Sequence, residues 1–272
     1  MSLSTSCRLI GISRQAIYQQ RQRWRDRQNE LKPVLELVMS IRRTLPRIGG
    51  RKLYFLIKPE LERQQIKLGR DVFFDFLRQN NLLIEPRRRY TKTTHSKHWM
   101  RKHPNLFQDL KITRSEQAFV SDITYIESQQ KVHYLSLVTD AFSRKIVGYE
   151  LSDDMKTTSV IKAMEKAIRE RKTKKSLLHH SDRGLQYCAE IYQRMLRKNN
   201  IQPSMTDGYD CYQNALAERV NGILKQEFLL QKYENKETLQ KVLDESIYAY
   251  NHYRPHLSLD MKTPNEVHEK AN

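Results

Sequence analysis

Three acidic residues, Asp122, Asp182 and Glu218, fall at positions where their side chains could do chemistry. Asp122 lies inside an apolar run that predicts a strand, where aspartate is normally disfavoured. Carboxylates that converge repel one another unless cations neutralise them. Their hard oxygen atoms favour Mg²⁺ or Mn²⁺, and two such ions about 4 Å apart can assist an in-line displacement at phosphorus. The three acids therefore predict metal-dependent phosphoryl transfer, provided that the fold brings them together.

Each acid also has a simpler interpretation when it is taken alone. Asp182, like Asp140, could form a turn at the end of a strand, and Glu218 could be an ordinary exposed residue of a helix. The catalytic interpretation therefore depends on the set, and on the elements that must position it.

The second half of the chain predicts a sheet with helices on its faces. Strands are predicted by short segments separated by turns rich in Ser, Gln and Asp, and helices by apolar residues at helical spacing. The expected strands are 119–126, 132–139, 145–151, 176–180 and 201–205, and the expected helices are 157–171, 189–198, 214–230 and 236–253. This order predicts an α/β fold, an RNase H-like mixed five-stranded sheet with flanking helices. In such a sheet the first and fourth strands are neighbours, so Asp122 and Asp182 would meet and a helix could deliver Glu218.

The positive charge is concentrated in the first part of the chain. The net charge is +18, and residues 1–115 hold 26 Lys and Arg against 9 Asp and Glu. Residues 116–272 hold 23 against 22. This distribution indicates a DNA-binding module joined to a nearly neutral part with a different function. The alternative, an evenly basic surface without a partner, is disfavoured.

The first part predicts small all-α, helix-turn-helix modules. In residues 1–28, Gly11 can turn the chain between two short helices, Ser13 can cap the second, and Arg14 would remain exposed to DNA. Residues 29–90 predict a second, basic helical module for DNA binding, with helices around residues 31–41, at 51–57 and at 71–79. In the last of these, Val72, Phe73, Phe76 and Leu77 are expected on one face.

The end of this module carries Arg87, Arg88 and Arg89, which could follow a phosphate backbone or form only a solvated face. Residues 91–116 are polar and without sustained periodicity, which predicts a linker. Histidines at 95, 98 and 103 lack the paired spacing and the nearby cysteines of zinc sites, so we interpret them as exposed linker residues.

Composition also limits the cellular setting. The apolar runs are far shorter than the roughly 20 residues that span a membrane, and the N-terminus lacks the pattern of a secretory signal. The three cysteines (Cys7, Cys188 and Cys211) are far apart and odd in number, which is typical of reduced thiols in the cytoplasm.

The spacing of the second and third acids, with 35 residues between Asp182 and Glu218, resembles the D,D-35-E pattern of retroviral integrases and insertion-sequence transposases. The surrounding residues resemble the motifs of the same family at 122–126, 140–148, 180–187, 214–225 and 250–264. The chain is identified as a member of the OrfB-type transposases, products of the second reading frame of two-frame insertion sequences. The resemblance covers nearly the whole chain.

The resemblance implies a DNA transposase that acts on the double-stranded terminal repeats of its element and on target DNA. It assigns catalysis and the binding of two Mg²⁺ or Mn²⁺ ions to the three acids. Water would cut at the element's ends, and each exposed 3′-hydroxyl would attack a phosphodiester directly, first giving a circular intermediate and then insertion. A homo-oligomer on DNA, fusion to or pairing with an upstream OrfA product, and a cytoplasmic, nucleoid-associated location are expected.

Further DNA contacts are predicted on the helix that carries Glu218. Asn214 and Lys225 would share its face, so Lys225 could reach a phosphate near the metals, unless it is an ordinary surface lysine. His180 could position water or DNA, or be satisfied at the end of its strand. Arg254 and His256 are expected only to fix the C-terminal tail.

Three departures from the family pattern are Phe119, Leu185 and Gln213, and the last leaves the DNA binding of its loop open. No equivalent of the N-terminal zinc module of retroviral integrases is visible in the sequence. Two other function classes compete with a transposase. One is a DNA-binding repressor with an inactive core, and the other is an RNase H-like nuclease without strand transfer.

Overall fold

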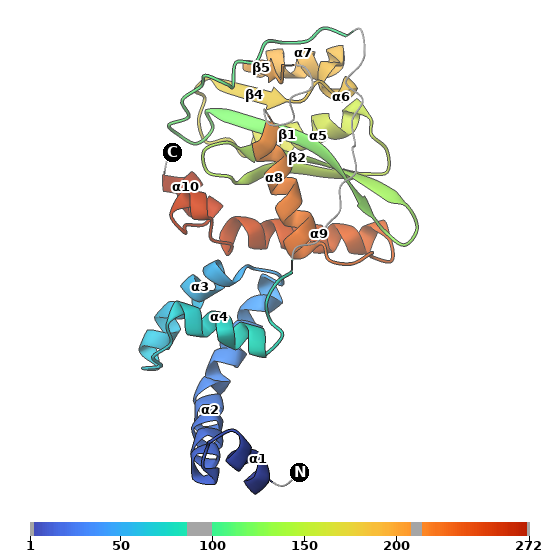
Figure 1. The fold of residues 1–272 in the computed structure, drawn as a ribbon. Helices are drawn as coiled ribbons and strands as arrows, with labels where there is room; N and C mark the ends of the chain where they lie inside the picture. Colours follow the sequence, from blue (N-terminus) through green and yellow to red (C-terminus); the bar gives the residue numbers. More distant parts are fainter. Residues whose placement is uncertain (1–2, 86–99, 208–213, 271–272) are drawn as a thin grey trace. The chain divides into compact units, whose positions relative to one another are not determined.

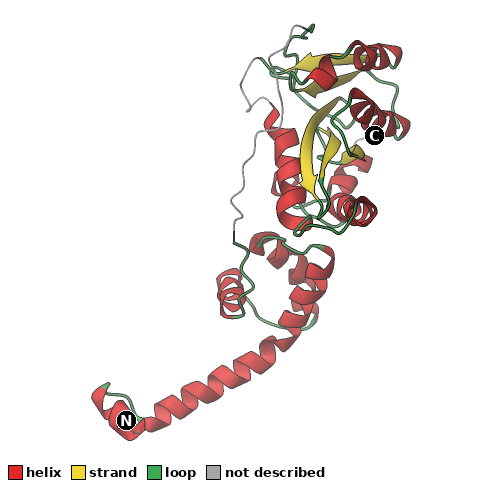
Figure 2. Cartoon of the chain, turned by 90° about the vertical axis from the view of Figure 1, so that its right-hand side faces the viewer, coloured by secondary structure: helices red, strands yellow, loops and turns green. Residues whose placement is uncertain are grey.

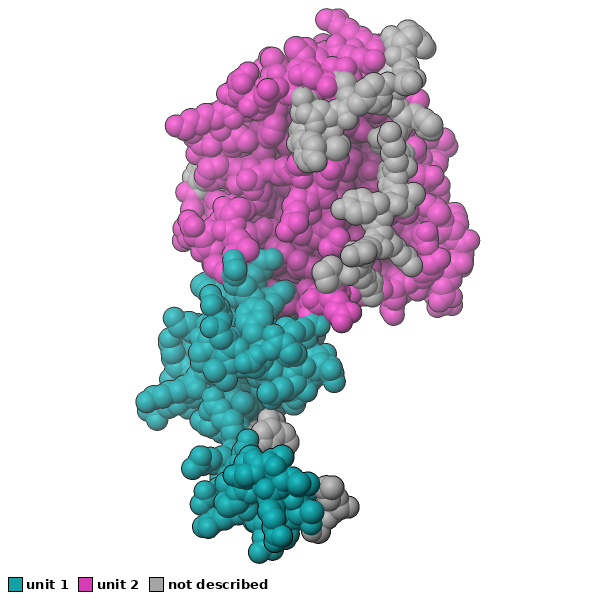
Figure 3. Space-filling model, in the orientation of Figure 1, with its two compact units in different colours: residues 1–44, 49–83 teal, residues 45–48, 84–272 magenta. Residues whose placement is uncertain are grey.

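The structure is a computed structural model of the chain that describes residues 3–85, 100–207 and 214–270. The chain divides into two compact units (Figure 3). The first comprises Met1–Thr44 and Gly49–Leu83, and the second comprises Leu45–Ile48 and Ile84–Asn272. Arg87, Arg88, Arg89, His95, His98, Cys211 and Gln213 lie outside the described residues.

The described part of the first unit is helical, with helices α1 (Leu3–Leu9), α2 (Arg14–Thr44), α3 (Gly50–Arg63) and α4 (Arg70–Gln79) (Figure 1). Its core is formed by apolar side chains that are at most 1% exposed, namely Val34, Val38, Leu53, Ile57, Phe73 and Leu77. On α4, Phe73, Phe76 and Leu77 are buried as predicted. Val72 is 48% exposed, so its expected place on the buried face is wrong.

The N-terminal turn is confirmed, but the second short helix is not. Gly11 has a φ of 69°, and Ser13 Oγ accepts a hydrogen bond from the backbone N–H of Ala16 at 3.1 Å. The helix that follows is α2, which runs for 31 residues and passes through the predicted boundary at 28/29 (Figure 2). Residues 15–32 contain neither glycine nor proline and are rich in good helix formers, so nothing in them ends the helix.

The second unit is built on a five-stranded sheet, as predicted. Its strands are β1 (Ala118–Glu127), β2 (Val132–Asp140), β3 (Ile146–Ser152), β4 (Leu177–Ser181) and β5 (Ile201–Met205). Their order is β3-β2-β1-β4-β5, with antiparallel pairing in β3-β2-β1 and parallel pairing of β1 with β4 and of β4 with β5. The first and fourth strands are thus neighbours, which the predicted topology required.

Helices cover both faces of this sheet (Figure 1). On one face, α5 (Thr157–Arg169) packs through Met164 on a core that includes Phe119. A Cβ on Gly148 would lie 2.2 Å from the carbonyl oxygen of Ala163, so glycine is required where α5 lies against β3. The same core receives α6 (Leu185–Cys188) and α7 (Glu190–Lys198). On the other face, Ala217 of α8 (Ala215–Ile223) packs on β1.

The helix predicted over 214–230 changes type part-way. After Ile223 the chain forms a π-helix, η2 (Leu224–Phe228), in which the N–H of Leu229 donates to the carbonyl of Leu224 at 2.9 Å. The C-terminal part contains α9 (Lys236–His252), the short η3 (Leu257–Leu259) and α10 (Pro264–Lys270). None of the described helices is long and apolar enough to cross a membrane.

Within the described residues 100–116, part of the predicted linker packs against the sheet, which the expectation of a linker did not include. The N–H of Leu106 donates to Ser204 Oγ at 2.9 Å, and the Phe107 ring stacks on His180 with centroids 4.8 Å apart. Leu110 and Ile112 also pack against the sheet. Isolated apolar residues in a polar segment show no period, so their burial was not visible in the sequence pattern.

Candidate active site

The three predicted acids come from three neighbouring elements of the second unit. Asp122 is in the middle of β1, Asp182 directly follows the last residue of β4, and Glu218 lies in the first turn of α8. In the parallel pairing of β1 with β4, Val120 is opposite His180. Asp122 and Asp182 each come two residues later, so their backbones advance side by side to the same end of the two strands.

The carboxylates are close enough to influence each other's protonation. Burial, followed by the charges of Asp182 and Glu218, raises the pKa of Asp122 to about 7, against hydrogen bonds from Asn221 and the N–H of Ile123. Burial and the charge of Asp182 also raise the pKa of Glu218. The fold therefore brings the three predicted side chains into one electrostatic cluster.

Each aspartate is oriented by hydrogen bonds. Asp122 Oδ1 accepts from the N–H of Ile123 at 2.9 Å, and its Oδ2 accepts from Nδ2 of Asn221 at 2.8 Å. Asp182 Oδ1 accepts from the N–H of Gly184 at 3.0 Å. A Cβ at Gly184 would also lie 3.0 Å from this oxygen, so a larger residue would crowd the carboxylate.

Sequence reasoning missed the contribution of Asn221. This residue lies three positions after Glu218 and therefore on the same face of α8, which is the signal that could have found it. Its side chain is only 5% exposed. One helix thus carries one acid of the cluster and holds another in place.

The three acids can be assessed as ligands for a divalent metal ion. Within residues 3–85, 100–207 and 214–270, no three His, Cys, Asp or Glu side chains already stand together as a ready-made metal site. The cluster nevertheless supplies only hard carboxylate oxygens, and the charges of Asp182 and Glu218 add to the effect of burial in raising the pKa of Asp122. A hard divalent cation would relieve that repulsion, so the residues fit such an ion.

Asn214 and Lys225 both lie against β1, but not on one continuous helical face. Asn214 is the N-cap of α8, 4% exposed, and its Nδ2 donates to the carbonyl of Ser121 at 3.1 Å. Lys225 lies in η2, with Nζ 4.2 Å from the ring centroid of Tyr125. The placement gives Asn214 a structural role, and contact with DNA would require its side chain to turn outwards.

The remaining predicted residues have varied surroundings. Arg14 is exposed at the start of α2. His180 is fully buried, with Nδ1 2.9 Å from Ser204 Oγ, which favours the structural alternative. Arg254 is 1% exposed and donates through Nε and Nη2 to both carboxylate oxygens of Glu227 at 2.7 and 2.6 Å, while its Nη1 lies 3.1 Å from His256. Arg254 and His256 therefore fix the tail, as expected.

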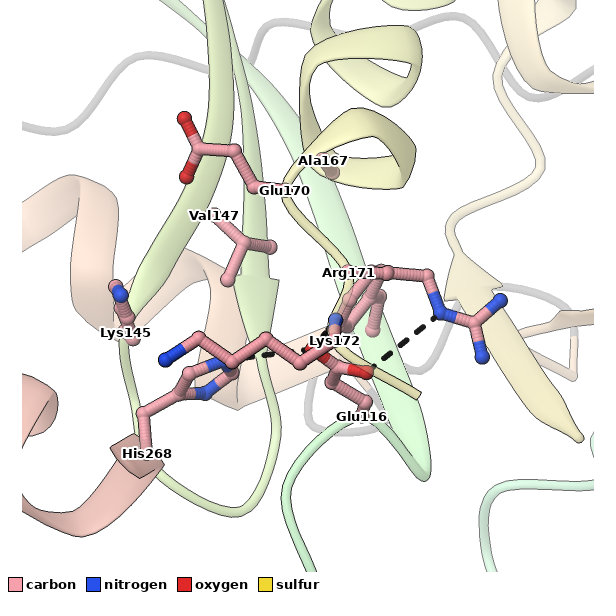
Figure 4. Close-up of a pocket in the computed structure, with 9 residues that line it drawn as sticks. Glu116, Lys145, Val147, Ala167, Glu170, Arg171, Lys172 and His268 are labelled. Carbon is pink, nitrogen blue, oxygen red and sulfur yellow. Dashed lines mark hydrogen bonds and ion pairs between the residues drawn. The ribbon is translucent and has the colours of Figure 1, made fainter. Parts of the chain in front are cut away.

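A small pocket lies at the opposite end of β1 and contains none of the three acids. Figure 4 shows Glu116, Arg171, Lys172 and His268 around it. Glu116 is buried, and its two carboxylate oxygens accept from the N–H groups of Lys172 and Thr173, both at 2.8 Å. His268 of α10 lies 3.8 Å from the same carboxylate. These contacts close the end of the core rather than form a second catalytic site.

The chain is similar to known proteins over nearly its whole length. Two models of the integrase core domain match residues 113–211 and 199–264. The 31 kDa protein of insertion element IS600 from Shigella sonnei is 31% identical, over 97% of each chain. Transposase InsF for insertion sequence IS3A from Escherichia coli K12 is 27% identical, over 99% of this chain and 94% of that protein.

The fold is also similar to that of a chain in the simian T-cell lymphotropic virus intasome, solved with the PP2A regulatory subunit B56 gamma. The TM-score is 0.51 with 20% identity, over 64% of this chain and 60% of that chain.

Proposed function

We propose, from the premise that this chain belongs to the insertion-sequence transposases that carry an integrase core, that Asp122, Asp182 and Glu218 are its catalytic residues. The chain is a DNA transposase, an enzyme of the class that cleaves DNA and transfers strands. The observation that supports the assignment is the parallel register of β1 and β4. This register brings Asp122 and Asp182 to the same end of the two strands, next to α8, which carries Glu218.

The three carboxylates would hold two Mg²⁺ or Mn²⁺ ions. Such ions, when bound, neutralise the acids and stabilise charge on the attacking and leaving oxygens of an in-line displacement. The chain's own contribution is orientation. Asn221 fixes Asp122, the Gly184 N–H fixes Asp182, and the exposed Glu218 can reach both the cluster and incoming DNA.

The reaction consists of two displacements at phosphorus. First, water attacks the phosphodiester at the element's end, a P–O bond forms as another breaks, and a 3′-hydroxyl is released. Second, that 3′-hydroxyl attacks a phosphodiester of the recipient strand, loses its proton, and displaces a new 3′-oxygen. The chain supplies no covalent nucleophile in either step. The first product of strand transfer would be a circle closed on one strand, and the second would be the inserted element.

DNA would be held by Lys225 beside the acids, by Arg14 in the first unit, and by Arg87, Arg88 and Arg89. The first 115 residues carry nearly the whole net positive charge, which suits neutralisation of a phosphate backbone. Joining two ends of one element requires at least two active sites, so we propose a homo-oligomer on DNA. Fusion to or pairing with an upstream-frame product would supply further end recognition.

Strand joining provides the test. The substrate is a labelled element end with its 3′-hydroxyl already exposed, incubated with target DNA and Mg²⁺. We expect joined product from the natural protein and none from Glu218→Gln, while Glu237→Gln remains active. Glu237 is a matched control, because it is also an exposed glutamate in the first turn of a helix. Cleavage without joining would favour a plain nuclease, and binding alone would favour a repressor.

A further inference from the structure

Lys225 is held against an aromatic ring beside the catalytic acids. Its Nζ lies 4.2 Å from the centroid of the Tyr125 ring, well within the distance of a cation–π contact. Tyr125 is on β1, three residues after Asp122, and both Tyr125 and Lys225 are half-buried. The contact therefore links β1, which carries Asp122, to η2, which follows the helix that carries Glu218.

The helix geometry explains why the lysine meets this ring. α8 gives way at Leu224 to the π-helix, and the buried side chains of Leu224 and Phe228 anchor that wider turn. This π-turn ends the helix, and its wider spacing aims the side chains of η2 differently from those of a regular α-helix. Here Lys225, which directly follows Leu224, lies over β1.

The electrostatic surroundings leave this ammonium group available to an outside anion. Burial lowers the pKa of Lys225, while the negative charges of Asp122 and Glu127 oppose that effect. Glu127 also forms an ion pair with Lys232 at 2.6 Å. Among the described residues, Lys225 Nζ contacts the uncharged Tyr125 ring, which attracts a cation without neutralising it.

We propose that Tyr125 is the positioning residue that presents the Lys225 ammonium group to a DNA phosphate next to the acids. The inference rests on the proposed function, which assigns Lys225 a contact with DNA. A ring occupies one side of an ammonium group and leaves N–H donors on the others for phosphate oxygens. Holding the lysine in place before DNA arrives reduces the side-chain freedom that binding would otherwise remove.

The test measures the affinity of the full-length protein for an element end in EDTA, as a function of salt. Removal of divalent metal separates binding from cleavage. Four variants are compared with the natural protein: Tyr125→Phe, Tyr125→Leu, Lys225→Gln and the double variant Tyr125→Leu/Lys225→Gln. Tyr134→Leu is the matched control, because Tyr134 is the half-buried partner of Tyr125 in the pairing of β1 with β2.

We expect Tyr125→Phe, which keeps the ring, to bind within about twofold of the natural protein. Tyr125→Leu should bind roughly three- to tenfold more weakly, the size of a partly desolvated cation–π contact. Lys225→Gln should lower the slope of log affinity against log salt concentration (the salt slope) by about the amount that one phosphate contact contributes. Adding Tyr125→Leu to Lys225→Gln should have no further effect on affinity. Tyr134→Leu should leave the salt slope unchanged.

Two results would overturn the inference while leaving the Lys225 contact intact. One is weak binding by Lys225→Gln with natural binding by Tyr125→Leu, and the other is additive effects in the double variant. Natural binding by Lys225→Gln would overturn the proposed phosphate contact itself. If Tyr125→Leu unfolds, Tyr125→Trp takes its place, and it should bind at least as tightly as Tyr125→Phe, because tryptophan is the better partner for a cation.

Discussion

Nδ2 of Asn221 donates a 2.8 Å hydrogen bond to Oδ2 of Asp122, and this bond joins α8 to the central strand of the sheet. Asn221 lies one helical turn after Glu218, so a shift of α8 would move one acid and release another. The Oδ1 atom of Asn221 is buried and has no hydrogen-bond partner among the described residues. The orientation of Asp122 is thus coupled to the position of Glu218 through a single side chain.

Replacing Asn221 by alanine should impair cleavage more than DNA binding. Asp122 would lose the hydrogen bond that fixes its carboxylate, and loss of such a supporting partner typically costs about 10- to 100-fold in activity or metal affinity. Cleavage of a labelled element end and binding in EDTA are measured on the same preparation. Asn199→Ala serves as the control, because the Asn199 side chain donates to the carbonyl of Met195 in the helix that it ends. Equal losses of binding and cleavage would contradict a positioning role.

The pH dependence of stability should include a contribution from His179. Burial, followed by the charge of His180, lowers the pKa of His179 to about 3, and its Nε2 lies 2.9 Å from Ser121 Oγ. Because the folded-state pKa is below the unfolded value of about 6.5, protonation favours the unfolded chain. This contribution is fully present above pH 6.5 and is lost as the pH falls towards 3.

Chemical denaturation from pH 8 to pH 4.5 checks this sign. The natural protein should lose roughly 2 kcal/mol through His179 alone between pH 6.5 and 5. His179→Gln should be less stable at pH 8, and the gap to the natural protein should narrow as the pH falls. A gap that stays constant over this range would show that His179 does not titrate as described.

Glu116 should stabilise the second unit from the end opposite to the acids. Removing its buried carboxylate would leave the N–H groups of Lys172 and Thr173 without acceptors, at a cost of about 1–3 kcal/mol each. Glu116→Ala should therefore unfold at a clearly lower denaturant concentration, and Glu116→Gln should lie between it and the natural protein. Glu170→Gln, an exposed neighbour, should have no effect. Comparable stability of all three variants would contradict this role.

The strand pattern and the likeness to a known family predicted most of the catalytic unit. Short apolar runs between turn residues located the five strands, and the RNase H-like order placed β1 beside β4, so that Asp122 and Asp182 were expected together. These predictions succeed because a strand that is covered on both faces reads as a short apolar run, as in β4, whose residues are all buried. The catalytic roles of the three acids remain predictions, because the structure shows where these residues lie and not the reaction that they catalyse.

The features that the sequence did not predict depend on tertiary packing. The π-turn after Ile223 accompanies the burial of Leu224 and Phe228, and no residue type in the sequence predicts it. Phe107 is an isolated aromatic residue in a polar segment, and its burial depends on His180, far away in the sequence. In the sequence, Asn221 cannot be distinguished from any other asparagine in a helix. Its role comes from the hydrogen bond to Asp122 on the neighbouring strand.

The measurement that tests the central claim most directly is cleavage of a labelled element end by the natural protein and by Asp182→Asn, with Mg²⁺, Mn²⁺ or EDTA. Asp109→Asn, which changes an exposed aspartate that precedes β1, is the control. We predict metal-dependent cleavage by the natural protein and by Asp109→Asn, and none by Asp182→Asn, although all three bind DNA. Cleavage by Asp182→Asn at the natural rate would contradict the assignment of the active site.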